Sequence, residues 1–332
     1  MRVSVLFDPA TPLRSTSQMR DDIGRFLTLS LDCARMLDSS AVCGIFVPER
    51  HARPDCLVPA PLEHLVALAS VTSRVRLGTY VLMPPLHAPA PLLERLAIVD
   101  HLSGGRLVCG LGVGFDDRYF DAHEQSIAER GRRMDNFLGL LHRAWSEGEP
   151  READPFVPPP QQRPRPPIWI GGSSVAAVER AARYGDALAL GFTDRRTDHW
   201  IELYRAACQR LGRPPSVVVI RSTWTRREPG VHAEARDLLG ELLTSEASRY
   251  RDRLQVEATG TIDYERVARH AYIGDPDTIV HRIREDGARW GLSEIVLRVP
   301  IAMGDPNAAL DCVRVIGEVI APALEEASDT VY

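Results

Sequence analysis

A glycine- and serine-rich turn near the middle of the chain has the chemistry of a phosphate-binding site. It consists of Gly171, Gly172, Ser173 and Ser174. An apolar run precedes the turn, and a helical pattern begins directly after it. Glycines let the backbone approach a ligand closely, and the first N–H groups of a helix have no partner within the helix. A serine hydroxyl and the helix dipole add to the attraction for an anion. The turn predicts a phosphate cradle, although an ordinary serine-capped turn has the same composition.

Titratable and aromatic side chains follow several other apolar runs of the sequence. They are Asp8, Arg50, His51, Tyr80, Phe115, Arg221 and Trp224. An imidazole has a pKa that suits proton transfer near neutrality, so His51 is a candidate acid–base residue. The alternative is a structural histidine held by Asp8 or Glu49. Because a guanidinium cannot act as a base, the arginines would instead hold an anionic ligand or pair with those carboxylates. The aromatic side chains would line a substrate pocket or pack in the core.

Several kinds of chemistry are disfavoured by what the sequence lacks. All 40 Lys and Arg residues are arginine, which excludes Schiff-base aldolases and pyridoxal phosphate enzymes, because both need a lysine amine. The 10 histidines form no His-x-His or His-x-x-x-His pair, so we expect no metal site. The sequence has no Gly-x-Ser-x-Gly motif of a serine hydrolase. A bound phosphorylated cofactor fits the remaining residues better than an acid–base pair alone.

Eight short apolar runs that alternate with helical patterns would position these side chains. The predicted strands are Val3–Phe7, Val42–Val47, Val75–Val81, Arg106–Leu111, Ile168–Ile170, Ala187–Leu190, Val217–Thr223 and Glu294–Val299. Such an alternation over 332 residues predicts a (β/α)8 TIM barrel. The candidate side chains would then gather at the carboxyl ends of the strands, where these barrels carry their active sites.

A doubly wound sheet is the alternative fold. It needs a Gly-x-Gly-x-x-Gly turn after an early strand, and the sequence has none there. The glycine-rich stretch Gly110–Gly114 leads to Asp116 and Asp117, which we expect to form an acidic loop rather than to begin a helix. The barrel is therefore the predicted fold.

The whole chain, residues 1–332, is predicted to form one domain with an insertion. The stretch Pro150–Pro167 contains eight prolines and is expected to be an extended connector, because strands and helices resume their alternation after it. Residues 226–272 form an insert between the last two predicted strands, which we expect to cover the mouth of the pocket. A terminal helix is predicted over Asn307–Glu326.

Composition and charge indicate a cytoplasmic protein. Hydrophobic residues make up 44% of the chain and charged residues 26%, which is ordinary for a globular protein. A net charge of −5 and a pI of about 6.1 argue against nucleic-acid binding. Six scattered cysteines without a Cys-x-x-Cys pair fit a reducing compartment. The chain starts with a strand pattern instead of a signal peptide, and no apolar run is long enough for a membrane span.

Four segments resemble the bacterial luciferase-like flavin oxidoreductase family. They are Ser73–Pro89, Asp100–Leu107, Glu129–Asp135 and Pro167–Ser173. The resemblance runs in order over about residues 3–190, thins in the insert and resumes from Gly274 to Leu297. The family is similar in fold to a (β/α)8 barrel, and it uses reduced FMN or, in a large branch, the deazaflavin F420. The resemblance implies this fold and one of these two cofactors.

The resemblance also implies roles for glycines and arginines of this chain. Gly78 and Thr79 would hold a bulge or a non-proline cis peptide bond behind the flavin ring. The turn Gly171–Ser174 would bind the cofactor phosphate, with help from Arg130 or Arg133. These two arginines could instead be solvated helix residues.

One position departs from the pattern of the family. Members commonly have Glu-His-His after the second strand, where this chain has Glu49, Arg50 and His51. The first histidine, which is linked to catalysis in luciferases, is replaced by a permanently charged arginine. This change puts a luciferase-type reaction in question and leaves His51 to donate to a flavin peroxide or to a substrate oxygen. Arg50 and Arg221 would hold an anionic substrate or an F420 tail, or form salt bridges.

The resemblance favours an FMN-dependent monooxygenase that hydroxylates a small organic molecule or carries out a Baeyer–Villiger-type insertion, in a setting such as secondary metabolism. The chain has no dinucleotide fingerprint, so a separate flavin reductase would supply the reduced FMN. The alternative is an F420-dependent oxidoreductase that transfers hydride without oxygen, which Gly112–Phe115 would suit. A third possibility is a non-catalytic flavin-binding relative. Relatives are often dimers, so a homodimer is expected.

Overall fold

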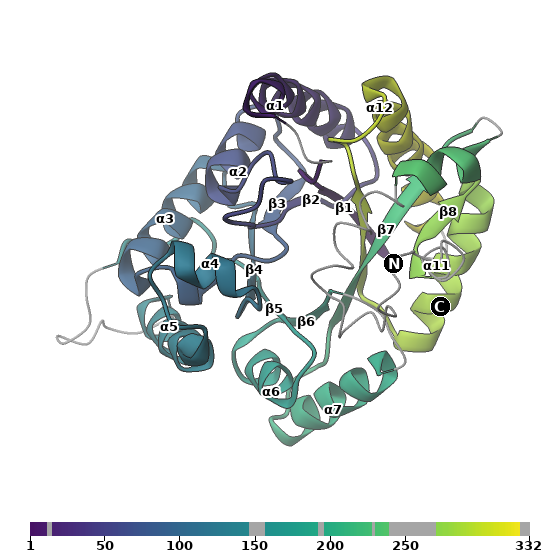
Figure 1. Ribbon diagram of the computed structural model, residues 1–332. Coiled ribbons are helices and arrows are strands. Elements are labelled where there is room, and N and C mark those ends of the chain that lie inside the picture. Colours follow the sequence, from purple (N-terminus) through teal and green to yellow (C-terminus); the bar gives the residue numbers. More distant parts are fainter. Residues whose placement is uncertain (12–14, 146–156, 192–195, 228–229, 239–269, 326–332) are drawn as a thin grey trace, which may run out of the picture.

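The computed structural model describes residues 1–11, 15–145, 157–191, 196–227, 230–238 and 270–325, and its strands close into a parallel barrel (Figure 1). Neighbouring barrel strands pair in parallel from β1 to β7. β7 then pairs with β9, and β9 pairs with β1, which closes the barrel. The strands are β1 (Arg2–Phe7), β2 (Gly44–Val47), β3 (Arg76–Thr79), β4 (Leu107–Gly112), β5 (Ile168–Gly171), β6 (Ala187–Leu190), β7 (Val217–Thr225) and β9 (Glu294–Val299). The predicted (β/α)8 barrel is confirmed.

Helices surround the barrel, and each of the main ones follows a strand (Figure 1). They are α1 (Thr16–Asp38), α2 (Pro61–Ala69), α3 (Pro89–Leu102), α4 (Asp117–Ala122), α5 (Arg130–Trp145), α6 (Val175–Tyr184), α7 (Thr197–Arg210), α11 (Pro276–Trp290), α12 (Pro306–Val315) and α13 (Ala321–Glu325). Single-turn 3-10 segments are η1 (Pro84–Leu86) and η2 (Ile127–Glu129). No helix among the described residues is long and apolar enough to cross a membrane.

Local sequence signals explain where several helices begin and end. Ser15 and Gln18 form a capping box before α1, in which each side chain bonds to the other's backbone N–H. Asp275 accepts a bond from the N–H of Thr278 at 2.9 Å and begins α11. Gly291 ends the same helix with a φ of 57°, a left-handed conformation that suits glycine.

The barrel interior and the layer between barrel and helices are two separate apolar cores. The interior is filled by side chains from the barrel strands other than β3, including Leu6, Phe46, Trp169, Val218 and Val296, and by Tyr80, which directly follows β3. Alternate residues of the same strands face outward and pack with the helices in the larger outer core. A filled interior restricts ligands to the ends of the barrel.

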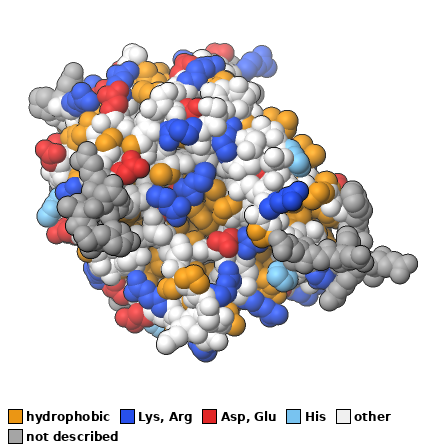
Figure 2. All heavy atoms as spheres, turned by 180° about the vertical axis from the view of Figure 1, so that it is seen from behind, with side chains coloured by type: hydrophobic (Ala, Val, Ile, Leu, Met, Phe, Trp, Pro, Cys, Tyr) orange, Lys and Arg blue, Asp and Glu red, His pale blue; other side chains and the backbone are white. Residues whose placement is uncertain are grey.

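Buried polar groups close the end of the barrel at which the strands begin. Glu294, which starts β9 and is fully buried, accepts a bond from the hydroxyl of Ser4 at 2.5 Å. The guanidinium of Arg76 binds both oxygens of Glu294, at 2.7 and 2.8 Å. Figure 2 shows the face opposite to that of Figure 1, with basic side chains near its middle. Chemistry is therefore expected at the other end, where the strands terminate.

Three expectations about elements need correction. Asp116 and Asp117 do not form a loop, because Asp116 caps α4 by accepting from the N–H of Arg118. The terminal helix is not uniform, since a π-helical segment, Ile316–Ile320, joins α12 to α13. The short strand β8 (Tyr272–Gly274) was not predicted, and it pairs with the end of β7. Most of the predicted insert, residues 239–269, lies outside the described residues. Its expected role in covering the pocket therefore stays a prediction.

Candidate active site

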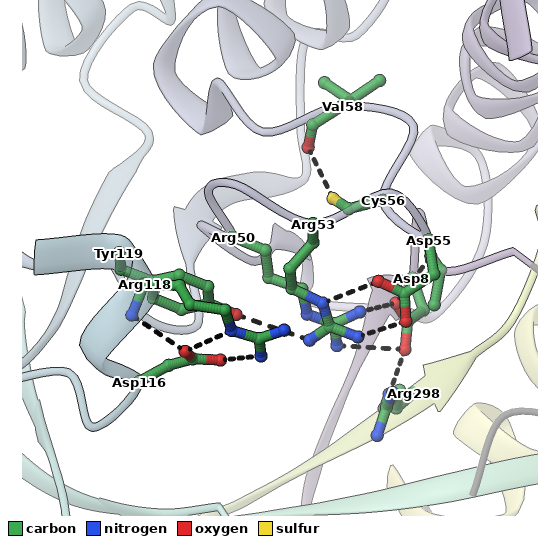
Figure 3. A network of polar contacts seen from close by, with 11 residues as sticks. Asp8, Arg50, Arg53, Asp55, Cys56, Val58, Asp116, Arg118, Tyr119 and Arg298 are labelled. Atoms are coloured by element: carbon green, nitrogen blue, oxygen red, sulfur yellow. Dashed lines mark hydrogen bonds and ion pairs between the residues drawn. The ribbon is translucent and has the colours of Figure 1, made fainter. Parts of the chain in front are cut away.

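A buried carboxylate between two arginines lies at the carboxyl ends of β1, β2 and β9 (Figure 3). Asp8 directly follows β1 and is fully buried. Arg50 donates to both of its oxygens, at 2.6 and 3.3 Å, and Arg298 donates to one of them. Burial alone would raise the pKa of Asp8, but the positive charges of Arg298 and Arg50 outweigh burial and hold that pKa well below its usual range. Asp8 therefore stays ionised and fixes both guanidinium groups.

Two further arginine–aspartate pairs extend this network toward α4 (Figure 3). Arg53 binds Asp55 through two bonds of 3.0 and 2.8 Å, and its third nitrogen lies 3.4 Å from the hydroxyl of Tyr119 on α4. Arg118 pairs with Asp116, the cap of the same helix. The bond between Arg53 and Tyr119 joins the segment after β2 to α4. The two ion pairs add to the β-bridge between Ala10 and Cys56 in holding the rim of the site.

Two histidines share one buried carboxylate beside this network. Glu49 is 5% exposed, and its Oε1 lies 2.9 Å from Nε2 of His51 and 2.7 Å from Nε2 of His87. Its other oxygen accepts from the backbone N–H of Met83. Burial raises the pKa of Glu49, but the hydrogen bonds from the two histidines outweigh burial and lower it. Because an ionised carboxylate can only accept, both rings donate from Nε2, which leaves each Nδ1 able to accept a proton.

A third histidine packs against the pair. The ring centroids of His123 and His51 are 4.4 Å apart, with an interplanar angle of 71°. Nδ1 of His123 lies 2.8 Å from the carbonyl oxygen of Tyr119, to which it must donate. The last turn of α4 thus holds the ring of His123 against His51.

The strand β3 carries a bulge where the floor of the site is expected. Gly78 pairs with Val108, and pairing with β4 resumes at Leu82 opposite Leu111. The β3 chain therefore advances four positions, from 78 to 82, while β4 advances three, from 108 to 111, so β3 has one extra residue. The peptide bond between Tyr80 and Val81 is cis. The expected bulge and cis bond exist, but they lie one to two residues beyond Gly78 and Thr79.

Glycines on the neighbouring strands make room for this bulge. A Cβ added to Gly110 would lie 1.9 Å from the carbonyl oxygen of Thr79. A Cβ on Gly112 would lie 2.5 Å from one methyl of Val81, and a Cβ on Gly171 would lie 2.9 Å from the other. Thr79 itself is buried and donates its hydroxyl to Gly110, at 2.7 Å. The half-buried side chain of Val81 is thus wedged between the ends of β4 and β5.

The predicted phosphate turn begins at this contact. Gly172 has a φ of 145°, and a Cβ there would meet the methyl of Ala177 at 2.8 Å, so glycine is required twice over. Ser174 caps α6 by accepting from the N–H of Ala177 at 3.2 Å. Ser173 is half-buried and Ser174 exposed, which leaves the start of α6 open to a ligand.

The two arginines expected to help with a phosphate brace other parts of the rim. Arg133 on α5 donates to the carbonyl oxygens of Pro85, at 2.6 Å, and His87, at 3.1 Å. Arg130 donates to the carbonyl oxygen of Ile127 at 3.1 Å. Arg133 thereby holds the turn that presents His87, and its binding of a phosphate stays a prediction.

The structure distributes the expected pocket residues over several places. Tyr80 is buried in the barrel interior, where its hydroxyl donates to the carbonyl oxygen of Leu190 at 3.1 Å. Phe115 is half-buried beside Tyr119, with ring centroids 6.5 Å apart.

Arg221 and Trp224 lie elsewhere than expected. Arg221 is in the layer between β7 and α11, where it pairs with Asp286 at 2.9 Å and lies over the rings of Tyr272 and Trp290. Its side chain points outward because Val218 and Ile220 take the inward positions of β7. Trp224 is fully buried in the outer core, since β7 pairs beyond Ser222 with β8. Neither residue is retained in the candidate pocket.

His87, His123 and the Arg53–Asp55 pair belong to the site but were not among the predicted residues. His87 is part of the segment Ser73–Pro89 that carries the family resemblance, which was a usable signal. The others have no local signal, because only the fold brings the segment after β2 against α4.

The fold and this rim of ionised and imidazole groups agree with one family of enzymes. Residues 6–294 match the family described as luciferase-like monooxygenase, so the chain belongs to that family. A 4-hydroxyprotoasukamycin monooxygenase of Streptomyces nodosus subsp. asukaensis is 28% identical over 311 residues, which covers 90% of this chain and 79% of that protein. The oxygenase component of a flavin-dependent trigonelline monooxygenase of Acinetobacter baylyi is 24% identical over 212 residues, 58% of each chain. This chain is therefore a luciferase-like oxidoreductase.

Solved structures with this fold include enzymes whose names mention each of the two expected cofactors. The monooxygenase RslO1 of Streptomyces bottropensis superposes with a TM-score of 0.79 and 26% identity, over 99% of this chain and 100% of that one. The oxygenating constituent of 3,6-diketocamphane monooxygenase of Pseudomonas putida, solved with FMN, gives 0.78 and 16%, over 97% and 98%. The F420-dependent tetrahydromethanopterin reductase of Methanopyrus kandleri gives 0.68 and 16%, over 98% and 100%. The last two likenesses show the fold alone.

Proposed function

We propose that this chain is a monooxygenase that uses reduced FMN and dioxygen to oxygenate a small organic substrate. The observation that carries the proposal is the contact between the β3 bulge and the end of β5. There Gly171, the first residue of the phosphate turn, faces the side chain of Val81. A planar ring lying against the bulge would be only a few residues away from a phosphate bound at Ser174, so one ligand could occupy both places. FMN combines such a ring with a single phosphate.

Reduced FMN, when bound, would supply the electrons that activate dioxygen. One oxygen atom would enter the substrate, and the other would leave as water with two electrons from the flavin. The chain's own part is to position the reactants, exclude water and move protons. Glu49 holds His51 with Nε2–H toward the carboxylate, so Nδ1 of His51 is the atom placed to exchange a proton. Arg50, fixed on Asp8, would orient an anionic group without taking a proton.

The proposal is tested with purified protein, FMN, NADH and a commercial flavin reductase. Under 18O2, a panel of cyclic ketones and phenols should include a substrate whose product contains one labelled atom. His51→Gln should lower the yield of product per flavin oxidised, whereas His101→Gln, on the outer face of α3, should not. The proposal is refuted if no protein-dependent incorporation occurs while the chain binds reduced FMN tightly.

A separate reductase and a small-molecule substrate are part of the proposal. The similar trigonelline enzyme is named as the oxygenase component of its system, which supports a second component here. Oxygen uptake by this chain should therefore require added reductase when NADH is the electron source. We also keep the homodimer as a proposal, and sedimentation equilibrium of the purified chain would test it.

The second candidate is an F420-dependent oxidoreductase that transfers hydride without oxygen. It is favoured by the similarity of Gly112–Phe115 to that branch, and F420-dependent enzymes share the fold. F420 also carries a phosphate, so the turn at Ser174 fits both cofactors. Hydride exchange between reduced F420 and a ketone or alcohol, in the absence of oxygen, would support this candidate over FMN.

A further inference from the structure

The cluster of Glu49, His51 and His87 has the ligand set of a transition-metal site. Each residue offers one ligand atom, a carboxylate oxygen or an imidazole nitrogen, and the three atoms all lie within 4.8 Å of one another. Imidazole and carboxylate are the ligands of many zinc sites, and open sites commonly use three protein ligands and one water. The expectation of no metal rested on local histidine spacing, which does not detect ligands that come from two different strands.

We propose that Glu49, His51 and His87 bind one Zn²⁺ ion, and that this ion inhibits the enzyme by immobilising His51. Both Nε2 atoms are directed at the same oxygen of Glu49, at 2.9 and 2.7 Å. In a tetrahedral site with bonds of about 2.0–2.1 Å, neighbouring ligand atoms are roughly 3.3 Å apart. To admit the ion, each Nε2 atom would move about half an ångström away from the oxygen of Glu49. The proton of each imidazole would then be on Nδ1 instead of Nε2.

The surroundings hold two of the ligands in place. The second oxygen of Glu49 is fixed by the backbone N–H of Met83, and the turn before His87 is held by Arg133 through the carbonyl oxygens of Pro85 and His87. Supports of this kind orient metal ligands and strengthen binding. The side chains of His51 and His87 are each 19% exposed, so an ion and a water molecule have access.

The two arginines closest to Glu49 in the chain are drawn to carboxylates. Arg50 follows Glu49 in the chain, but its guanidinium is drawn to Asp8 at 2.6 Å. The next arginine, Arg53, is paired with Asp55 at 2.8 Å. Among the described residues, the donors to Glu49 are the two imidazoles and the backbone N–H of Met83. With both imidazoles neutral, a divalent ion would replace two N–H bonds with stronger interactions.

Direct binding is the test, and it does not depend on the monooxygenase proposal. Zn²⁺ is titrated by calorimetry into the metal-free chain carrying Cys43→Ser, because Cys43 is the half-buried thiol among the described residues. We expect one ion per chain, and Co²⁺ should give visible d–d absorption at the same stoichiometry. Glu49→Gln, His51→Gln and His87→Gln should each weaken binding at least tenfold, whereas His101→Gln should leave it unchanged.

Two results would overturn the metal site. One is the absence of stoichiometric binding to the parent chain, and the other is equal affinity in the three ligand variants. Because His51 and His87 are partly exposed, their variants keep the test decisive if Glu49→Gln disturbs folding, which circular dichroism would reveal. If binding is lost as expected while Zn²⁺ leaves oxygen incorporation unchanged, the site stands and its inhibitory role is wrong.

Discussion

The wedge formed by Val81 between β4 and β5 can be tested by filling the space beside it. A methyl group added in Gly112→Ala would lie 2.5 Å from Cγ2 of Val81, with its next neighbours at 3.5 and 3.9 Å. Carbon atoms pack best at about 3.5–4.0 Å, so the overlap is roughly 1 Å and falls on one side-chain methyl. Such overpacking costs about 1–3 kcal/mol. We therefore expect Gly112→Ala to lower the free energy of unfolding by about 2 kcal/mol.

The clash with Val81 makes a double mutant informative. Val81→Ala removes both methyl groups and should cost about 1 kcal/mol by itself, because Val81 is only half-buried. In Gly112→Ala/Val81→Ala the overlap is gone, so the double variant should be more stable than the sum of the single effects predicts, by about 1–2 kcal/mol. Gly171→Ala, whose added methyl lies 2.9 Å from Val81, should show the same sign with a smaller effect.

Urea unfolding followed by circular dichroism gives these free energies, and titration with reduced FMN reports the effect on the site. Gly24→Ala is the matched control, because Gly24 lies within α1 with nothing within 4 Å of its added Cβ. That change should stabilise the chain by about 0.5–1 kcal/mol, as expected for glycine inside a helix. Additive effects of Gly112→Ala and Val81→Ala would show that the wedge does not exist as described.

Three further predictions follow from other parts of the molecule. Asp8→Asn should lower the free energy of unfolding by about 3 kcal/mol in urea titrations, because it removes the fully buried charge between Arg50 and Arg298; a loss below about 1 kcal/mol would contradict this network. Burial lowers the pKa of His64 to about 4 from 6.5, so the unfolded chain binds a proton that the folded chain excludes. Stability should fall by about 3 kcal/mol between pH 6.5 and 4, and this part of the pH dependence should be absent in His64→Gln. Ser174→Ala should cost about 1 kcal/mol of stability and weaken the binding of FMN, while the binding of riboflavin, which has no phosphate, should be unaffected. Equal losses of affinity for both flavins would show that this turn does not bind the phosphate.

The strands and their order were predictable because each barrel strand is a short apolar run with its own turn signals. Ala187–Leu190 and Glu294–Val299 agree with the structure at both ends. The turn from β5 into α6 was equally predictable, since Gly172 has a backbone conformation that suits glycine and Ser174 caps the helix; its binding of a phosphate stays a prediction. In these places the local conformational preference of the sequence agrees with the conformation in the folded structure.

The parts that were not predictable depend on contacts between distant segments. The bulge is displaced from Gly78 because the pairing of β3 with β4 sets its position, and sequence alone does not give a register. Glu49 and His87 are 38 positions apart and meet only through adjacent strands. The outward direction of Arg221, in contrast, could have been inferred, because Val218 and Ile220 already occupy the inward positions of β7.

The proposed function depends on which cofactor the chain binds, with its ring proposed to lie against the β3 bulge and its phosphate at Ser174. The most direct measurement is an anaerobic titration of the purified chain with reduced FMN and, separately, with reduced F420, each followed by admission of oxygen. We expect saturable binding of reduced FMN, weakened by Ser174→Ala, and oxygen uptake by the complex. Tight binding of F420 together with no binding of FMN would contradict the proposed FMN-dependent function.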